Sequence, residues 1–400
     1  MKRSRFVLGS LAGLAVVAHE SEFFARALAA PGDRSDRVLV LVNLQGGNDG
    51  LNTVVPYASP EYYRYRPTLA IAQGDVLRID ERIGFNPALA SLKTMYDAGN
   101  VAIVQGAGYP RPDRSHFRST EIWQTAVPDR YERTGWLGRY LDGAAIPKEN
   151  LFGAVAIAPV LPEALIANGI DVPAISQLRG YGLLSDRNAA QRREFSALVA
   201  DERAPFGSPY LATIARIEDR AQRGSEALPK LLAGYTTDAQ YPATTIGRSL
   251  ALAAQMIGSG LGTRAIYVQH GSFDTHAAQR ATQDRLLREL AEALAAFYAD
   301  LGAHGNAGST LTLTFSEFGR RVAENASQGT DHGEAAPMFA VGPVKGGIYG
   351  THPSLDDLDG GDITFTTDFR RVYATVVERW FGRSAAGVLA DTFDPMSFLD

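Results

Sequence analysis

The chain has 400 residues, of which 45% are hydrophobic and 21% charged, so it can bury a substantial core in one large domain or two smaller ones. Acidic residues outnumber basic ones by 44 to 39, and no long run of one sign occurs, so composition gives no electrostatic reason to expect a nucleic-acid partner. The absence of cysteine excludes disulfides, thiolate metal sites and cysteine nucleophiles. Any metal must therefore bind to oxygen and imidazole.

The first 29 residues have the features of an export signal. Basic residues precede an apolar run from Phe6 to Ala18, which is too short to cross about 30 Å of hydrocarbon, and small residues follow at 27–29. The string RSRFVL resembles the twin-arginine export pattern, except that Ser4 replaces its second arginine. We expect a periplasmic or secreted protein with no stable membrane span and a mature start near Ala30. The alternative is a cytoplasmic protein with an apolar amino-terminal helix.

From about residue 37 onward, strand-like runs alternate with helix-like ones, the pattern of an α/β protein with a largely parallel central sheet and helices on both faces. The strands are predicted at 38–44, 101–106, 154–159, 264–271, 309–319 and 337–343. The helices are predicted at 87–98, 115–126, 188–199, 209–223, 245–259, 278–301 and 368–381. Because residues 160–260 have few strand signals, we interpret them as a mainly helical insertion or cap within a single domain spanning 30–400.

Acidic and histidine residues recur where these predicted strands end. Asp49 follows the first strand, Asp274 and His276 follow another, and Glu317 closes a third. A further pair, Asp331 and His332, directly precedes the strand at 337–343. Ligands of open α/β sheets bind beyond the carboxyl ends of the strands, so we expect these side chains to converge. If they hold one or two ions, Asp49, Asp274, Glu317 and His332 should lie within about 8 Å of one another.

Crowded carboxylates repel one another, and a divalent cation resolves that conflict. Carboxylate oxygen combined with neutral imidazole suits zinc, manganese or iron(II), whereas oxygen alone suits calcium or magnesium. The alternative for Asp49 is a simple structural role, because an Asp after a glycine pair often occupies a turn or caps a helix. Both interpretations remain open from spacing alone.

Several longer strings are specific enough to suggest a family: LQGGNDGLNTVVPY, GYPRPDRSHFRSTEIWQTA, GWLGRYLD, GSFDTH, TFSEFGRRVAENASQGTDHG and APMFAVGPVKGGIYG. Over nearly the whole mature chain they resemble the bacterial domain of unknown function 1501 family. Members of that family look like distant relatives of the alkaline phosphatase and sulfatase superfamily. The resemblance implies an alkaline phosphatase-like fold with metal ions beside a serine or threonine nucleophile.

The same resemblance suggests roles for the residues at the strand ends. It places Asp49 at one metal, and Asp274 with His276 at the other. Where the superfamily has Asp-His at the end of the next strand, this chain has Ser316 and Glu317. His332 precedes APMFAVGPV in the manner of the last metal histidine, and Asp331 beside it is the candidate replacement for the missing ligand. One or two ions, zinc or manganese first among them, are expected.

The predicted helix at 115–126 carries the candidate nucleophile, Ser115. A metal would lower the pKa of its hydroxyl, while the helix amino terminus and Arg114 or Arg118 would bind the anion. The alternative is that Ser115 only caps the helix. We expect His116 to pack away from the site, because an adjacent helical residue points about 100° away.

Three functions are compatible with the sequence. The first is an exported metal-dependent hydrolase of phosphate or sulfate esters, acting on a small-molecule or glycan ester. No Ser-x-Pro-x-Arg or Cys-x-Pro-x-Arg string occurs, which argues against an ordinary sulfatase. The second is a degenerate relative that binds a glycan or cell-envelope partner without turnover. The third, a nucleotide-cofactor oxidoreductase, is supported only by the first strand and its glycine pair.

Overall fold

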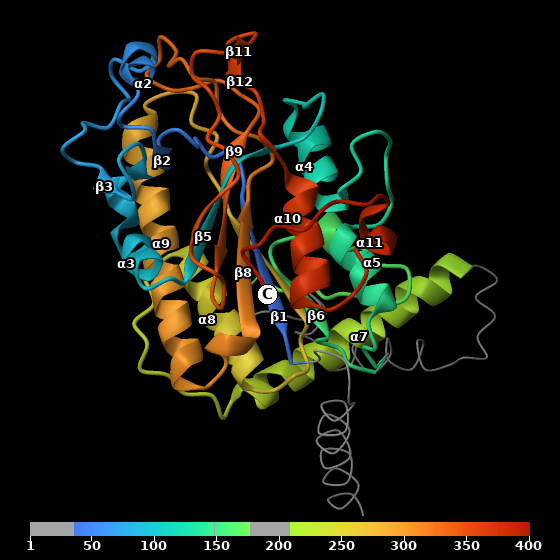
Figure 1. Cartoon of the computed structure of the whole chain (residues 1–400). Coiled ribbons are helices and arrows are strands. Elements are labelled where there is room, and N and C mark those ends of the chain that lie inside the picture. The colour runs from blue at the N-terminus through green and yellow to red at the C-terminus, as the bar shows by residue number, and fades with distance from the viewer. Residues whose placement is uncertain (1–35, 148, 177–208) are drawn as a thin grey trace, which may run out of the picture.

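The computed structural model describes residues 36–147, 149–176 and 209–400, and its centre is an eight-stranded sheet (Figure 1). The strand order is β10-β5-β9-β8-β1-β7-β6, and β13 also pairs with β5. All pairings in this sheet are parallel except those of β9, which runs antiparallel to β5 and β8. The strands are β1 (Val38–Leu44), β5 (Val101–Gly108), β6 (Ala154–Ile157), β7 (Ala265–His270), β8 (Thr310–Phe315), β9 (Ala336–Val341), β10 (Gly347–Tyr349) and β13 (Thr367–Asp368).

The central strand β1 is buried along its whole length between β7 and β8. Its alternate side chains point to opposite faces of the sheet, as the pleat requires. Val40 and Val42 belong to the hydrophobic core on one face, and Leu39 and Leu41 belong to the core on the other. The nearly continuous apolar sequence of β1 therefore reflects burial on both faces, which is typical of parallel sheets.

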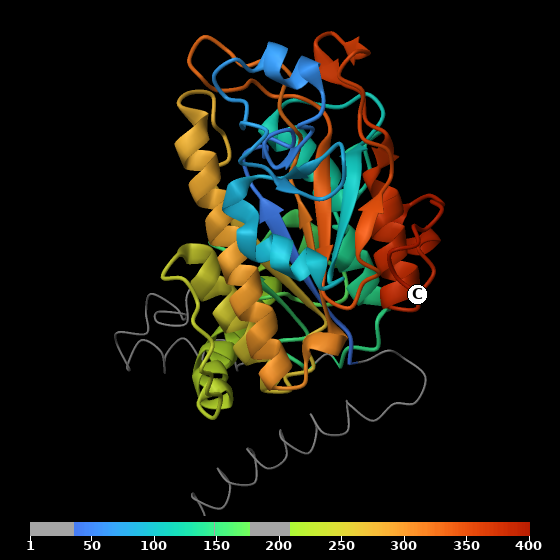
Figure 2. The same ribbon diagram turned by 60° about the vertical axis from the view of Figure 1, so that its left-hand side comes forward.

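Helices cover both faces of the sheet (Figures 1 and 2). One face packs against α3 (Ala90–Asp97), α8 (Thr245–Gly258) and α9 (Gln279–Ala303), whose buried side chains share a core with β1. The other face packs against α4 (His116–Thr125), α5 (Trp136–Gly143), α10 (Phe369–Thr375) and α11 (Ala386–Leu389). Between α10 and α11 lies a π-helical turn at Val376–Trp380.

The smaller elements lie mostly in the connecting segments. They comprise α2 (Pro60–Tyr65), a three-stranded sheet of β2 (Val54–Val55), β4 (Gly84–Phe85) and β3 (Leu77–Arg78), a two-stranded sheet of β11 (Leu358–Asp359) and β12 (Asp362–Ile363), and 3-10 turns at Pro87–Leu89, Glu163–Leu165 and Ala307–Ser309. In Figure 1, α2, β11 and β12 lie together at one end of the central sheet. These three elements therefore lie at the end of the sheet where the carboxyl end of β1 is found.

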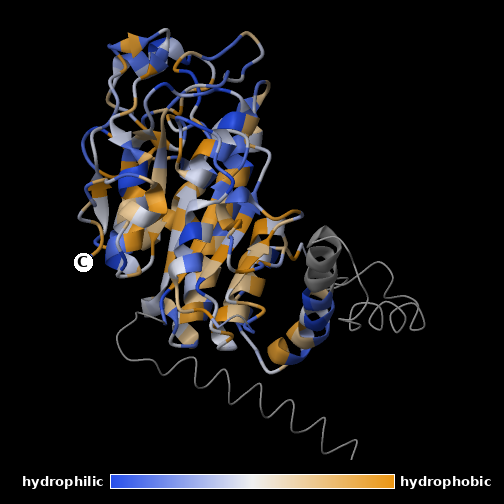
Figure 3. Ribbon diagram, turned by 90° about the vertical axis from the view of Figure 1, so that its right-hand side faces the viewer, coloured by the Kyte–Doolittle hydropathy of each residue, from blue (hydrophilic) through white to orange (hydrophobic). Residues whose placement is uncertain are grey.

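The fold class predicted from the sequence is confirmed: the sheet is mostly parallel and has helices on both faces. Helical segments are present in the predicted insertion, namely α7 (Pro209–Leu232) and α8. Where α7 joins the domain it is hydrophobic (Figure 3), and Leu228 and Leu232 are buried there. The predicted export signal and the predicted helix at 188–199 lie outside the described residues. Within the described ranges, no helix combines the length and apolar character that a membrane crossing requires.

The reversed direction of β9 matters for the site. Because β9 runs opposite to β8, its amino-terminal end lies at the same sheet edge as the carboxyl end of β8. The segment that leads into β9 carries Asp331 and His332. It therefore meets the loops that follow β1, β7 and β8 at one edge.

Candidate metal centre

The loop after β1 approaches two other loops closely, and its two glycines permit this. Gly46 and Gly47 have φ of +116° and +79°, a backbone region that side chains disfavour. A Cβ on Gly46 would clash with the backbone nitrogen of Asp274, and one on Gly47 would clash with the Phe318 ring. The glycine pair thus lets the segments after β1, β7 and β8 pack against one another.

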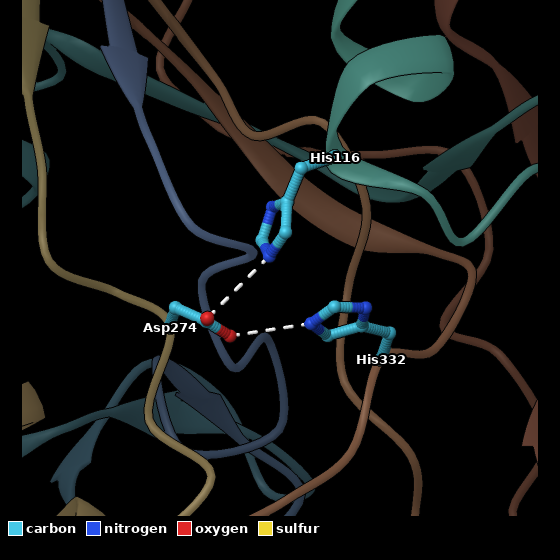
Figure 4. A group of neighbouring side chains, drawn as sticks. All are labelled: His116, Asp274 and His332. Carbon is cyan, nitrogen blue, oxygen red and sulfur yellow. Dashed lines mark hydrogen bonds and ion pairs between the residues drawn. The ribbon is translucent and has the colours of Figure 1, made fainter.

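Three potential ligand atoms meet at this edge: Oδ1 of Asp274, Nε2 of His276 and Nε2 of His332. The carboxylate oxygen lies 3.0 Å from His276 Nε2 and 3.2 Å from His332 Nε2, and the two nitrogens are 2.9 Å apart. Figure 4 shows Asp274 and His332 pointing toward one another. Ligand atoms bound tetrahedrally to zinc at about 2.0–2.1 Å lie roughly 3.3 Å apart, so this triangle has nearly the size of one face of such a site.

The hydrogen bonds of the two rings fix which nitrogen faces the triangle. His276 Nδ1 lies 3.2 Å from Oδ1 of Asp331, and His332 Nδ1 lies 2.9 Å from the carbonyl oxygen of Arg114. Both partners only accept hydrogen bonds, so Nδ1 of each neutral ring can donate outward, and a cation in the triangle would then take the Nε2 lone pair. Without a cation, an Nε2 proton can instead bond to Asp274 Oδ1, as the 3.2 Å distance from His332 allows. A divalent cation satisfies this arrangement, so the residues fit a metal.

Arg320 holds Asp274, one corner of the triangle, by a hydrogen bond. Its buried guanidinium donates to Oδ1 of Asp274 at 2.7 Å and to the carbonyl oxygens of Gly47 at 2.7 Å and Thr330 at 2.8 Å. Burial raises the pKa of Asp274, but hydrogen bonds from Arg320 and His332 outweigh it and lower that pKa to about 2. Burial also lowers the pKa of His332. An ionised carboxylate and a neutral imidazole are the protonation states that a metal requires.

His116 is also part of this site. It is the first residue of α4, and its Nδ1 lies 2.9 Å from Oε1 of Glu317 while its Nε2 lies 3.5 Å from Oδ2 of Asp274. Ligand atoms of His116, Asp274 and His332 all lie within 4.8 Å of one another, as Figure 4 illustrates. The prediction that His116 packs away from the site is wrong. The amino terminus of α4 points at the sheet edge, so its first side chain enters the site and Ser115 stays outside.

Glu317 lies at the end of β8, as the sequence suggested. Its side chain is only 1% exposed, and Oε1 accepts a hydrogen bond from the backbone N–H of Gly46 at 2.8 Å as well as contacting His116. Oε2 has no hydrogen-bond partner among the described residues. The hydrogen bond to Glu317 raises the pKa of His116, although burial opposes it.

The structure does not bring Ser115 and Arg118 into this cluster. Ser115 is exposed, and its hydroxyl makes no capping bond to α4. Arg118 pairs along α4 with Glu121 at 2.6 Å and donates to the carbonyl oxygen of Pro128 in the following loop at 2.6 Å. Neither residue is among those that line the cleft beside His116.

Asp49 is also directed elsewhere. Its carboxylate forms an ion pair with Arg66 at 2.5 Å, with both side chains fully buried, and accepts hydrogen bonds from the backbone N–H of Leu51 at 3.1 Å and from the side chain of Gln279. Within the described chain, no hydrogen bond or ion pair joins Asp49 to the histidine cluster. The structure therefore brings together Asp274, His276, Glu317, Asp331 and His332, and it leaves Asp49 in a separate polar network.

A cleft of about 480 Å³ opens beside the cluster, and its walls include His116, Phe117, Thr120, Asp274 and Glu317. Phe117 is 91% exposed. The first backbone N–H groups of α4 have no capping side chain from Ser115, so they are available to an anion at this helix terminus. Sequence reasoning missed His116 and Arg320. Both stand in quoted family strings, RSHFRS and SEFGRR, but neither spacing nor charge pattern distinguished them from surface residues.

Comparisons with known proteins place the chain in a family but not in a known activity. No curated protein matches it significantly. Ps i-CgsB, of which a complex with k-i-k-neocarrahexaose has been solved, is 12% identical in that complex, with 91% of this chain and 74% of that chain covered and a TM-score of 0.37. The lipoteichoic acid synthase LtaP from Listeria monocytogenes is 9% identical, with 91% and 75% covered and a TM-score of 0.37.

Alkaline phosphatase from the Antarctic bacterium TAB5 is 12% identical, with 78% of this chain and 94% of that chain covered and a TM-score of 0.32. At such scores, these similarities establish neither fold nor function. The family model gives the firmer result. Residues 85–388, more than half of the chain, match the model described as protein of unknown function (DUF1501), and the chain therefore belongs to this family.

Proposed function

We propose that this protein is an exported, metal-dependent hydrolase of phosphate or sulfate esters. The observation that carries the proposal is the triangle of Asp274 Oδ1, His276 Nε2 and His332 Nε2, whose edges measure 2.9–3.2 Å. Mixed carboxylate and imidazole ligands favour zinc or manganese over calcium or magnesium. When bound, such a cation polarises the ester and lowers the pKa of a bound water.

The residues of this chain would prepare the site for an anionic ester. Asp331 and the carbonyl oxygen of Arg114 hold the two rings with Nε2 facing inward. The uncapped amino terminus of α4 supplies backbone donors on the wall of the cleft next to Asp274. A cleft of about 480 Å³ is large enough for a small-molecule ester or one sugar unit of a glycan ester.

Turnover of an aryl phosphate and an aryl sulfate tests the proposal. We expect the metal-stripped protein to be inactive, and zinc or manganese to restore turnover of at least one ester. His276→Ala should lose that turnover, whereas Ser115→Ala should keep it, because Ser115 lies outside the cleft. Equal turnover with and without metal would contradict the proposal. Tight metal binding without turnover of either ester would instead support a non-catalytic relative that binds a glycan or envelope partner.

A further inference from the structure

We infer that His116 is a covalent nucleophile, oriented by Glu317, that attacks a phosphate ester. The inference rests on the proposed hydrolase function and adds to it the attacking atom and the substrate class. It starts from a hydrogen-bonded pair at the wall of the cleft: Nδ1 of His116 lies 2.9 Å from Oε1 of the buried Glu317.

This hydrogen bond determines what His116 presents to the cleft. A carboxylate can only accept, so in the neutral ring Nδ1 donates to Glu317 and Nε2 carries the lone pair. A histidine held in this way by a carboxylate has the orientation that nucleophile and base dyads require. The ring packs against Phe318 and His332, whose centroids lie 4.9 Å and 4.5 Å from its own.

The two oxygens of Asp274 separate His116 from the proposed metal ligands. Oδ1 lies 3.0–3.2 Å from the Nε2 atoms of His276 and His332, whereas His116 Nε2 faces Oδ2 at 3.5 Å. Each atom of the triangle lies within 3.2 Å of the other two, whereas Nε2 of His116 is 3.5 Å from Asp274 Oδ2. Its Nε2 therefore lies beside the triangle, where it can approach a phosphorus atom while the phosphate oxygens face the cation and the amino terminus of α4.

Glu317 is suited to stabilise the product of the attack. A ring phosphorylated at Nε2 keeps its proton on Nδ1 and carries a positive charge. Glu317 is buried, and its Oε2 has no hydrogen-bond partner among the described residues. Positive charge that develops on His116 would pair with this buried carboxylate, which the hydrogen bond already holds against the ring.

Competing hydroxyl groups are less well placed. Ser115 does not line the cleft. Thr120 and Ser272 do, but among the described residues no acid or base is hydrogen-bonded to either hydroxyl. A hydroxyl without an adjacent base is a weak nucleophile at neutral pH.

The reaction balances in two steps. In the first, the Nε2 lone pair of His116 forms the N–P bond while the P–O bond to the alcohol breaks, and the leaving oxygen takes a proton from water. In the second, a water oxygen forms a P–O bond while the N–P bond breaks, and the proton that this water loses neutralises the hydroxide left by the first step, which releases inorganic phosphate and restores His116. The net change is hydrolysis of one phosphate monoester by one water.

Rapid acid and alkali quenching of the metal-loaded protein with a radiolabelled aryl phosphate tests the inference. We expect protein-bound label that survives alkali and is lost in acid, that mass spectrometry maps to His116, and that His116→Asn lacks. Ser115→Ala and Thr120→Val should keep the label. Label that survives acid would identify a hydroxyl nucleophile and overturn the inference. Loss of bound metal in His116→Asn would make His116 a ligand and also overturn it.

A second measurement decides the matter if the intermediate does not accumulate. His116→Gly with added imidazole should recover turnover and release N-phosphoimidazole, which phosphorus NMR detects. Turnover by the parent protein with neither label nor N-phosphoimidazole from the variant would refute the nucleophile and leave the hydrolase proposal standing. Turnover of a sulfate ester but of no phosphate ester by the metal-loaded parent would refute the nucleophile alone, and absence of turnover of either ester would refute both.

Discussion

Asp49 and Arg66 form an ion pair at 2.5 Å in which neither side chain is exposed. Arg66 also donates to the carbonyl oxygens of Val322 at 2.8 Å and Arg321 at 2.9 Å, and Asp49 accepts from Gln279. The pair thus joins the loop after β1 to the segment between β8 and β9 and to the start of α9. Its residues hold the loops around the candidate site without touching the histidine cluster.

This arrangement predicts a structural role for Asp49. Asp49→Asn leaves the Arg66 charge buried without a countercharge, so we expect the free energy of unfolding to fall by about 3–5 kcal/mol while bound metal per chain stays unchanged. Denaturant unfolding and metal analysis measure the two effects. The matched control is Asp97→Asn, whose Asp97 is 57% exposed beside Lys93 and should cost about 0.5 kcal/mol or less. A variant that keeps its stability but loses its metal would make Asp49 a ligand.

Asp331 should affect metal affinity through His276. Asp331→Asn weakens the acceptor that keeps the proton on His276 Nδ1, so the dissociation constant for zinc should rise about 10–100-fold. Competition with a chelating dye measures the change. Asp129→Asn is the control, because Asp129 pairs with the exposed Arg111, outside the candidate site, and should not alter affinity. Identical zinc dissociation constants for the parent, Asp331→Asn and Asp129→Asn would show that Asp331 does not contribute to the metal site.

Arg320 should be indispensable to the fold of the site. Arg320→Lys cannot satisfy the carbonyl oxygens of Gly47, Thr330 and Phe273 together with Asp274, so we expect a loss of about 3 kcal/mol or more in the free energy of unfolding. Arg285→Lys is a matched change in an exposed helical pair with Glu289 and should cost about 0.5 kcal/mol or less. Equal unfolding midpoints for the two variants would contradict this account of Arg320.

Acid should weaken the metal-free protein in a defined pH window. Interactions with Arg320 and His332 lower the pKa of Asp274 from an ordinary value of 3.8 to about 2 in the folded chain. A carboxyl group whose folded pKa is depressed stabilises the fold above its unfolded pKa, and that contribution is lost as pH falls through the folded pKa. Stability should therefore drop more steeply between pH 3.8 and about 2 in the parent than in Asp274→Asn. Parallel curves from denaturant unfolding would show that Asp274 contributes nothing in this window.

Much of the fold followed from local pattern. The apolar runs predicted β1, β5, β6, β7, β8 and β9, because strands buried on both faces have almost continuous apolar sequences. The direction of β9 did not follow, since six apolar residues look the same whichever way the strand runs. Small elements such as α2 and β10 were also missed, because they are too short to show a period.

The site was only partly accessible from sequence. Residues next to strand ends converge because the sheet aligns those ends, which explains why Asp274, Glu317 and His332 were found. Asp49 points away from the site because it pairs with Arg66. That contact joins side chains 17 positions apart across a loop, and no periodic pattern in the sequence predicts it. The sequence predicts that His116 points away because it follows Ser115 by one helical position, but α4 begins at His116, and the side chain of His116 enters the site.

Zinc binding to the metal-stripped protein tests the central claim most directly. Titration against a chelating dye should find one tight site per chain in the parent and in Asp49→Asn, and no tight site in His332→Ala or Asp274→Asn, with thermal melting used to verify that each variant is folded. The account predicts that Asp274, His276 and His332 are sufficient to define this site. A folded parent protein that binds neither zinc nor manganese, or a site that survives both His332→Ala and Asp274→Asn, would contradict it.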